Sequence, residues 1–227
     1  MSNGIRRPVW TSRRGLEREW NHDAGGLSIV GNQAIAVIVD EFTSSPSRGR
    51  MARELVCRLL QSWYGAPTVV GAEVSLMMQS VHTELRHQYR QSMAAYGVLL
   101  TEKGSQAASV LVAGDCRIGS LRDRGVVWLT RPHTKEETLI QMGEKPAPGD
   151  RSTVTRCFKP RRWMEPETVT LEQNDDMTWA ISTDGYSSTT QVGDPFQSDD
   201  DASCIIFSWA GIGEPDTTDG NWYTVPG

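Results

Sequence analysis

Acidic residues stand at the ends of four apolar, strand-forming stretches of this chain. They are Asp40 after AIAVIV, Asp115 after SVLVAG, Asp184 after WAIST, and Asp200 just before SCIIF. Carboxylates that converge from strand ends repel one another unless a cation lies between them. Oxygen ligands of this kind select Mg²⁺, Mn²⁺ or Ca²⁺ rather than zinc. The pattern therefore predicts a divalent-cation site, with turn-forming aspartates as the alternative.

The composition indicates a globular protein of ordinary character. The chain has 227 residues, 38% of them hydrophobic and 22% charged, which suits a folded domain with a substantial core. Its net charge of -5 disfavours general nucleic-acid binding. No apolar run approaches the roughly 20 residues of a membrane span, and no apolar run follows the basic N-terminus. We therefore expect a cytoplasmic protein that binds neither nucleic acid nor membrane.

Cysteine spacing gives no sign of a zinc site or a disulfide framework. The four cysteines, Cys57, Cys116, Cys157 and Cys204, are far apart and form no CxxC pair. Reduced thiols in the core are the simplest interpretation.

Helical periodicity marks two segments in the first half of the chain. Met51, Leu55, Leu59 and Trp63 predict a helix over 47–63, with Ser45 as its N-cap and Pro46 at its first position. A second helix is predicted over roughly 73–93. The charges, prolines and glycine of 131–150 indicate a helix followed by a loop.

Short β-rich stretches follow the two helices. An antiparallel meander is predicted over 98–100, 107–113, 117–121 and 126–129, and two further strands at 178–183 and 203–209. Strands, then a helical pair, then strands again predict an α+β layered domain. We expect one domain over 1–227, with 1–15 and 211–227 as irregular terminal segments.

Six local motifs, in order, resemble the type 2C (PPM) metal-dependent serine/threonine protein phosphatases. The resemblance runs from Arg18 to Phe207 and indicates a short, divergent, bacterial-type member. The motifs are REWNHDA at 18–24, VIVDE at 37–41, GSQAASVLVAGDCRIGSLRDRGVVWLT at 104–130, His133 with Glu136 and Glu137, STDGY at 182–186, and DDAS at 200–203. Each motif is weak alone, but their order is specific.

The resemblance implies a fold and a set of site residues. The fold would be a four-layer αββα sandwich, with two antiparallel sheets flanked by helix pairs. The cofactors would be two Mn²⁺ or Mg²⁺ ions, with a weaker third position. By the resemblance, Asp40 would bridge the two metals, and Asp184 and Asp200 would bind the first metal. The carbonyl of Glu41 would bind the second metal, and Asp115 and Asp184 would bind at the third position. Arg18 would bind the phosphate, and Asp23 and His22 would support the metal site.

The implied activity is hydrolysis of phosphoserine and phosphothreonine in signalling proteins. Two cations can activate a water and neutralise the phosphoryl oxygens, and an arginine fork adds two aligned donors. In-line attack then needs no covalent nucleophile, which agrees with the lack of a Cys-x5-Arg or Gly-x-Ser-x-Gly motif. The implied partners are a phosphorylated protein substrate and a cognate serine/threonine kinase system.

The residues after Asp40 depart from the family pattern. Glu41 replaces a glycine whose carbonyl binds metal, although its side chain could add a ligand. Phe42 replaces a histidine proposed as general acid, and losing such a donor costs on the order of 10²–10⁴ in rate. His22 stands where the family often has glutamate; a solvent-exposed histidine is the alternative there. These changes leave open an inactive pseudophosphatase that binds phosphoproteins, and a calcium-stabilised structural domain.

Overall fold

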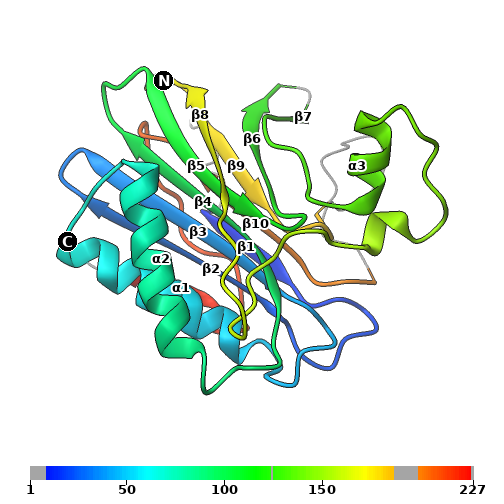
Figure 1. Ribbon diagram of the computed structural model, residues 1–227. Helices are drawn as coiled ribbons and strands as arrows, with labels where there is room; N and C mark the ends of the chain where they lie inside the picture. Colours follow the sequence, from blue (N-terminus) through cyan, green and yellow to red (C-terminus); the bar gives the residue numbers. More distant parts are fainter. Residues whose placement is uncertain (1–8, 124, 187–198, 226–227) are drawn as a thin grey trace.

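The structure is a computed structural model that describes residues 9–123, 125–186 and 199–225. Most of the described chain forms two β-sheets and three α-helices (Figure 1). The six-stranded sheet has the order β11 (Trp222–Val225), β2 (Asp23–Val30), β3 (Gln33–Glu41), β4 (Ala94–Glu102), β5 (Ala107–Ala113) and β8 (Glu167–Glu172). The five-stranded sheet has the order β1 (Trp10–Arg13), β10 (Ala202–Phe207), β9 (Trp179–Ser182), β6 (Arg117–Arg122) and β7 (Gly125–Trp128). The helices are α1 (Arg50–Gly65), α2 (Gly71–Leu85) and α3 (Lys135–Gln141), with a 3₁₀ turn, η1 (Asp150–Ser152).

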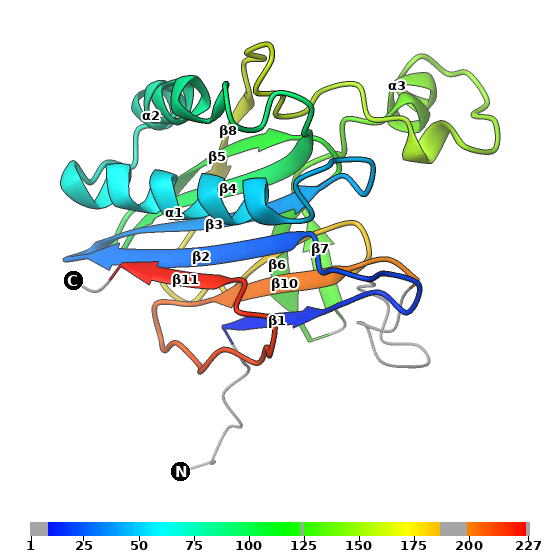
Figure 2. The ribbon, with the colours of Figure 1, turned by 90° about the horizontal axis from the view of Figure 1, so that it is seen from below.

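The six-stranded sheet lies between the helices and the other sheet. Figure 2 shows α1 and α2 on one of its faces and the five-stranded sheet on the other. β3 explains the arrangement, because its side chains alternate between faces. Ile35, Val37 and Val39 pack with the helices, whereas Ala36 and Ile38 pack with the second sheet. A strand buried on both faces needs a continuous apolar run.

The α+β class is confirmed, but the expected four layers are not all present. In the described ranges no helix pair covers the outer face of the five-stranded sheet. α3 buries none of its side chains and lies to one side of both sheets (Figures 1 and 2). The six-stranded sheet is also mixed, because β11 runs parallel to β2. These residues form three layers, helix pair, sheet and sheet.

The start of α1 differs from the expected one. The helix begins at Arg50 after Gly49, whose φ of 78° is left-handed, and Ser45 is not the N-cap. The Ser45 hydroxyl instead bonds the next loop, since it donates to the carbonyl of Met93 and accepts from the Met93 amide. α2 ends at Leu85, eight residues before the expected end, and the chain then turns. No helix in the described ranges is long and apolar enough to cross a membrane.

The predicted meander is divided between the two sheets. β4 pairs with β5, but β6 and β7 belong to the five-stranded sheet, so the chain changes sheets across residues 114–116. β8 was not anticipated. The terminal segments expected to be irregular each contribute a strand, β1 and β11. All three are peripheral, and two have only four residues, so their sequences carry little periodicity.

Candidate metal centre

Five aspartates line one cavity of about 180 Å³, namely Asp40, Asp115, Asp184, Asp200 and Asp201. Asp40 is near the end of β3, and Asp115 lies where the chain changes from β5 to β6. Asp184 follows β9, and Asp200 precedes β10. The fold therefore brings together the four strand-end carboxylates that the sequence singled out.

The negative charges of these aspartates repel one another. Burial raises the pKa of Asp40 well above its ordinary value, and the carboxylates of Asp23 and Asp184 raise it further. Burial, followed by the charge of Asp184, raises the pKa of Asp115 to about 6. The pKa of Asp184 is raised by burial and by Asp200. A divalent cation among these groups would relieve both the desolvation and the repulsion.

Asp23 lies fully buried beside this group. It is paired directly with Asp40 across β2 and β3, and its Oδ2 accepts a hydrogen bond from the Thr183 hydroxyl at 3.1 Å. Within the described residues its Oδ1 has no hydrogen-bond partner. Burial, and then the charge of Asp201, raises its pKa. An orphaned carboxylate oxygen in such a place is costly unless a proton or cation satisfies it.

His22 is buried, which excludes the solvent-exposed alternative. Its Nδ1 lies 3.2 Å from Oδ2 of Asp201, and its backbone amide donates to the same oxygen at 2.7 Å. The other oxygen of Asp201 accepts from the Gly15 amide at 2.9 Å. Asp201 therefore fastens the 15–22 segment to the start of β10. Sequence reasoning gave Asp201 no role, although it stands in the same acidic run as Asp200.

Arg18 is paired with one of the cavity aspartates. Its Nη2 lies 2.7 Å and its Nε 3.0 Å from Oδ1 of Asp200. Two nitrogens of the Arg18 guanidinium are therefore already bound to the Asp200 carboxylate. The pair brings Arg18 to the centre, as the motif order suggested.

Two further arginines approach the aspartates. The charges of Arg151, in η1, and Arg117, in β6, partly offset the rise that burial and Asp200 cause in the pKa of Asp184. Burial, and then the charge of Arg151, lowers the pKa of Arg117, whose guanidinium lies 4.4 Å from the ring centroid of Trp128. Sequence reasoning missed both. Arg117 could have been noticed, because it stands two residues after Asp115.

The donor set fits a hard divalent cation in charge and in atom type. The cavity carboxylates supply only oxygen donors, and within the described residues one buried oxygen of Asp115 has no hydrogen-bond partner. The carboxylates surround the cavity but do not converge. No cluster of three or more Asp, Glu, His or Cys side chains in the described ranges is arranged to hold a metal ion. Metal binding would therefore require the carboxylates to move closer together.

Comparison with known proteins identifies the architecture. No protein-family model matches the chain, and no curated protein is similar to it in sequence. A bacterial serine phosphatase matches with a TM-score of 0.74 at 14% identity, over 94% of this chain and 100% of that one. Stp1 from Staphylococcus aureus gives 0.73 at 16% identity, over 89% and 94%. The chain has the fold of the bacterial PPM serine/threonine phosphatases.

A third phosphatase of the PPM fold was solved with metal ions bound. The catalytic domain of PstP, in complex with two manganese ions, matches with a TM-score of 0.66 at 16% identity, over 87% of this chain and 96% of that one. At such identities the likeness establishes the fold. The resemblance stated from the motifs is thereby confirmed at the level of architecture.

Glu41 departs from the motif pattern and has a structural position of its own. Its buried carboxylate points to the start of α1, where Oε2 accepts the Ala52 amide at 3.2 Å and Oε1 accepts the Ser47 hydroxyl. α1 has no side-chain bond from its N-cap residue, Gly49, so Glu41 supplies the missing acceptor from β3. The carboxylate of Glu41 therefore makes its hydrogen bonds at the start of α1, on the side away from the neighbouring aspartates.

Proposed function

We propose that the chain is a metal-dependent phosphatase that hydrolyses phosphoserine and phosphothreonine in proteins. The observation that carries the proposal is the single cavity lined by Asp40, Asp115, Asp184 and Asp200 in a PPM fold. A cluster of four partly buried carboxylates is unfavourable without a cation, and turn formation alone does not require it.

The residues divide into metal-holding and substrate-holding groups. When bound, two Mn²⁺ or Mg²⁺ ions would lower the pKa of a water and neutralise phosphoryl oxygens. Asp40, Asp184 and Asp200 would hold these ions, together with the backbone carbonyl of Glu41. Asp115 and Asp184 would supply oxygens to a weaker third position. Their oxygens match the preference of these ions for hard ligands.

Arg18 binds the substrate phosphate. Its Nε and Nη2 are engaged with Asp200, so Arg18 presents Nη1 to the substrate or exchanges Asp200 for the phosphate. A phosphate offers the same planar pair of acceptors as a carboxylate, which makes that exchange geometrically simple. Asp23 and His22 support the centre from the buried side. The partners are a phosphoprotein and the serine/threonine kinase that modifies it.

Hydrolysis of p-nitrophenyl phosphate and of a phosphothreonine peptide, with and without Mn²⁺, tests the proposal. We expect metal-dependent turnover of both. Asp184→Asn should lower kcat/KM about a hundredfold or more while circular dichroism stays unchanged, because a lost metal ligand removes several kcal/mol of charge stabilisation. Asp123→Asn is the matched control, since Asp123 is exposed and lies away from the cavity.

A phosphoprotein-binding module without turnover is the second candidate. The commitment of Glu41 to α1, the Arg18–Asp200 ion pair and the phenylalanine at position 42 favour it. Metal-saturated protein that hydrolyses neither substrate, yet binds the phosphopeptide, would support this candidate against the first. Melting that depends on Ca²⁺, without either property, would instead indicate a structural metal domain.

A further inference from the structure

Two basic segments meet beside the aspartate cavity. Residues 42–53 contain three arginines, and residues 85–101 contain two arginines and a histidine; neither segment contains Asp or Glu. The whole chain carries a net charge of -5, so this concentration of positive charge is local. Hydrogen bonds tie the segments together, from the Phe42 amide to the carbonyl of Met93 at 2.9 Å and from the Met93 amide to Ser45 Oγ at 3.0 Å.

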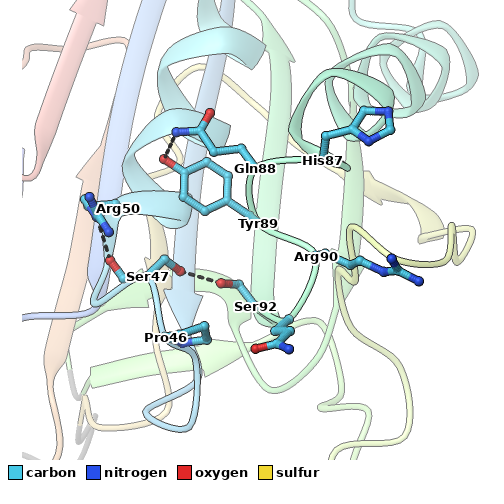
Figure 3. Close-up of a pocket in the computed structure, with 9 residues that line it drawn as sticks. Pro46, Ser47, Arg50, His87, Gln88, Tyr89, Arg90 and Ser92 are labelled. Carbon is cyan, nitrogen blue, oxygen red and sulfur yellow. Dashed lines mark hydrogen bonds between the residues drawn. The ribbon is translucent and has the colours of Figure 1, made fainter.

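The two segments enclose a cavity of about 480 Å³, here called the basic pocket. Its lining includes Arg50, His87 and Arg90 and contains no carboxylate. Figure 3 shows Arg50 on the α1 side, with Arg90 and His87 on the opposite loop and directed outward. Arg50 and Arg90 therefore stand apart on two rims, an arrangement that suits an extended chain with several negative groups better than one compact anion.

The arginines of the basic pocket are available for such a partner. Arg50 is held at the start of α1 by a 3.1 Å bond from its Nε to the carbonyl of Ser47, which leaves its terminal nitrogens for other acceptors. Among the described residues, neither Arg50 nor Arg90 makes an ion pair with a carboxylate. Unpaired arginines on a rim are suited to carboxylate and phosphate groups.

The start of α1 is not itself the anion site. Glu41 already accepts the Ala52 amide there and also the Ser47 hydroxyl, and Ser47 in turn contacts Ser92. Ser47 and Ser92 line the basic pocket, and binding must come from the arginine side chains at its rim.

The basic pocket is continuous with the aspartate cavity along the loop after β3. Thr43 lines both the aspartate cavity and a neighbouring cavity, whose lining includes Arg18 and Arg48 together with Glu17 and Glu19. Pro46 lines that neighbouring cavity and the basic pocket. Residues 43–47 span at most about 14 Å, so a peptide crosses the same distance with about four residues.

We propose that the basic pocket binds acidic groups of the substrate protein, aspartate, glutamate or a second phosphate, three to five residues from the phosphorylated position. The proposal rests on the proposed phosphatase function. It specifies the substrate class as acidic or multiply phosphorylated segments. Exposed ion pairs contribute about 0.2–1 kcal/mol each, so two arginines change affinity between about two- and thirtyfold, and five- to tenfold is the middle of that range.

The test compares four phosphothreonine peptides and two protein variants. The peptides carry glutamates three to five residues before the phosphothreonine, glutamates at the same distance after it, alanines throughout, or a second phosphothreonine four residues away. The variants are Arg90→Glu and the double variant Arg50→Gln/Arg90→Gln. Arg122→Ala serves as the control, because Arg122 is exposed and lines a different cavity. Kd is measured by fluorescence anisotropy, and kcat/KM by phosphate release.

We expect one acidic peptide to bind five- to tenfold more tightly than the alanine peptide, and its advantage to fall at high salt. The variants should lose the advantage but retain wild-type p-nitrophenyl phosphate hydrolysis; circular dichroism checks their folding. Equal affinity for the acidic and alanine peptides, or an advantage that survives in Arg90→Glu, overturns the inference. If peptide binding depends on the arginines but no peptide is hydrolysed, the basic pocket is supported and the phosphatase function is rejected. Failure of the inference and failure of the proposed function therefore give different results.

Discussion

At the residue scale, Arg18 illustrates how one side chain can connect charge balance with substrate binding. It neutralises Asp200 through two nitrogens in the structure. In the proposed reaction it must also reach the phosphate. We therefore expect its removal to affect both the acidic cavity and the substrate.

Replacing Arg18 tests that double role. Arg18→Ala should lower kcat/KM for a phosphopeptide about ten- to a hundredfold, because hydrogen bonds to charged groups contribute about 1.5–3 kcal/mol. Steady-state kinetics at saturating Mn²⁺ gives the measurement. Arg13→Ala is the matched control, since Arg13 forms an exposed ion pair with Asp216. Equal effects of the two changes would exclude a role for Arg18 in substrate binding.

Glu41 should matter more for stability than its position beside Asp40 suggests. Glu41→Ala removes the acceptor of the Ala52 amide at the start of α1 and leaves buried donors unpaired. The free energy of unfolding should fall by about 1–3 kcal/mol, measured by urea denaturation of the metal-free protein. Glu172→Ala, on an exposed strand position, should change it by less than about 0.5 kcal/mol. A neutral Glu41→Ala would mean that α1 does not depend on this bond.

At the element scale, the crossing between β5 and β6 positions Asp115. Gly114 has a φ of 97°, and a Cβ there would lie 2.3 Å from the Cβ of Ala95. The neighbouring strand β4 therefore allows only glycine immediately before the aspartate. The backbone, more than any side chain, places this carboxylate in the cavity.

A pair of glycine substitutions separates steric conflict from conformational preference. Gly114→Ala should cost on the order of 2–3 kcal/mol of unfolding free energy, because strained φ and a backbone clash combine. Gly104→Ala has a similar φ of 84° but open space around it, so it should cost only about 1 kcal/mol. Urea denaturation of both variants measures the difference. Equal losses of unfolding free energy in the two variants would show that β4 moves at Ala95 to make room for the new methyl group.

The ends of the strands were easier to predict from the sequence than which strands pair with one another. The run that ends at Asp40 is short, continuously apolar and rich in β-branched residues, which favours a buried strand, and it is β3 in the structure. The change of sheet at 114–116 could not be predicted, because both β5 and β6 have strand-forming sequences and the sheet that each joins depends on long-range pairing. For the same reason the contacts of Arg18 with Asp200 and of Glu41 with Ala52 followed from the fold and not from spacing.

At the scale of the whole molecule, the aspartate cavity makes stability depend on cations. Burial, and then repulsion by neighbouring carboxylates, raises the pKa values of Asp40, Asp115 and Asp184, which weakens the metal-free fold at neutral pH. Binding of a cation to the folded state alone adds stability by mass action.

Thermal melting at pH 7.5 measures this dependence. Mn²⁺ or Mg²⁺ at a hundred times its dissociation constant should add about 2.7 kcal/mol, or roughly 5–10 °C in Tm for a chain of this size. Asp184→Asn should lose most of the shift, and Asp123→Asn should keep it. A Tm that is independent of these ions would argue against any metal centre in the cavity.

The parallel pairing of β11 with β2 has a consequence for synthesis. β2 ends at Val30 and its neighbour β11 begins at Trp222, and Asn221, just before β11, donates a hydrogen bond to the carbonyl of Asp23. At about 5–20 residues per second, a ribosome needs roughly 10–40 s to make the intervening chain. During that interval the edge of β2 that later pairs with β11 has no partner strand, and exposed edges of this kind recruit other chains. The nascent protein therefore has an open edge on its larger sheet until β11 emerges.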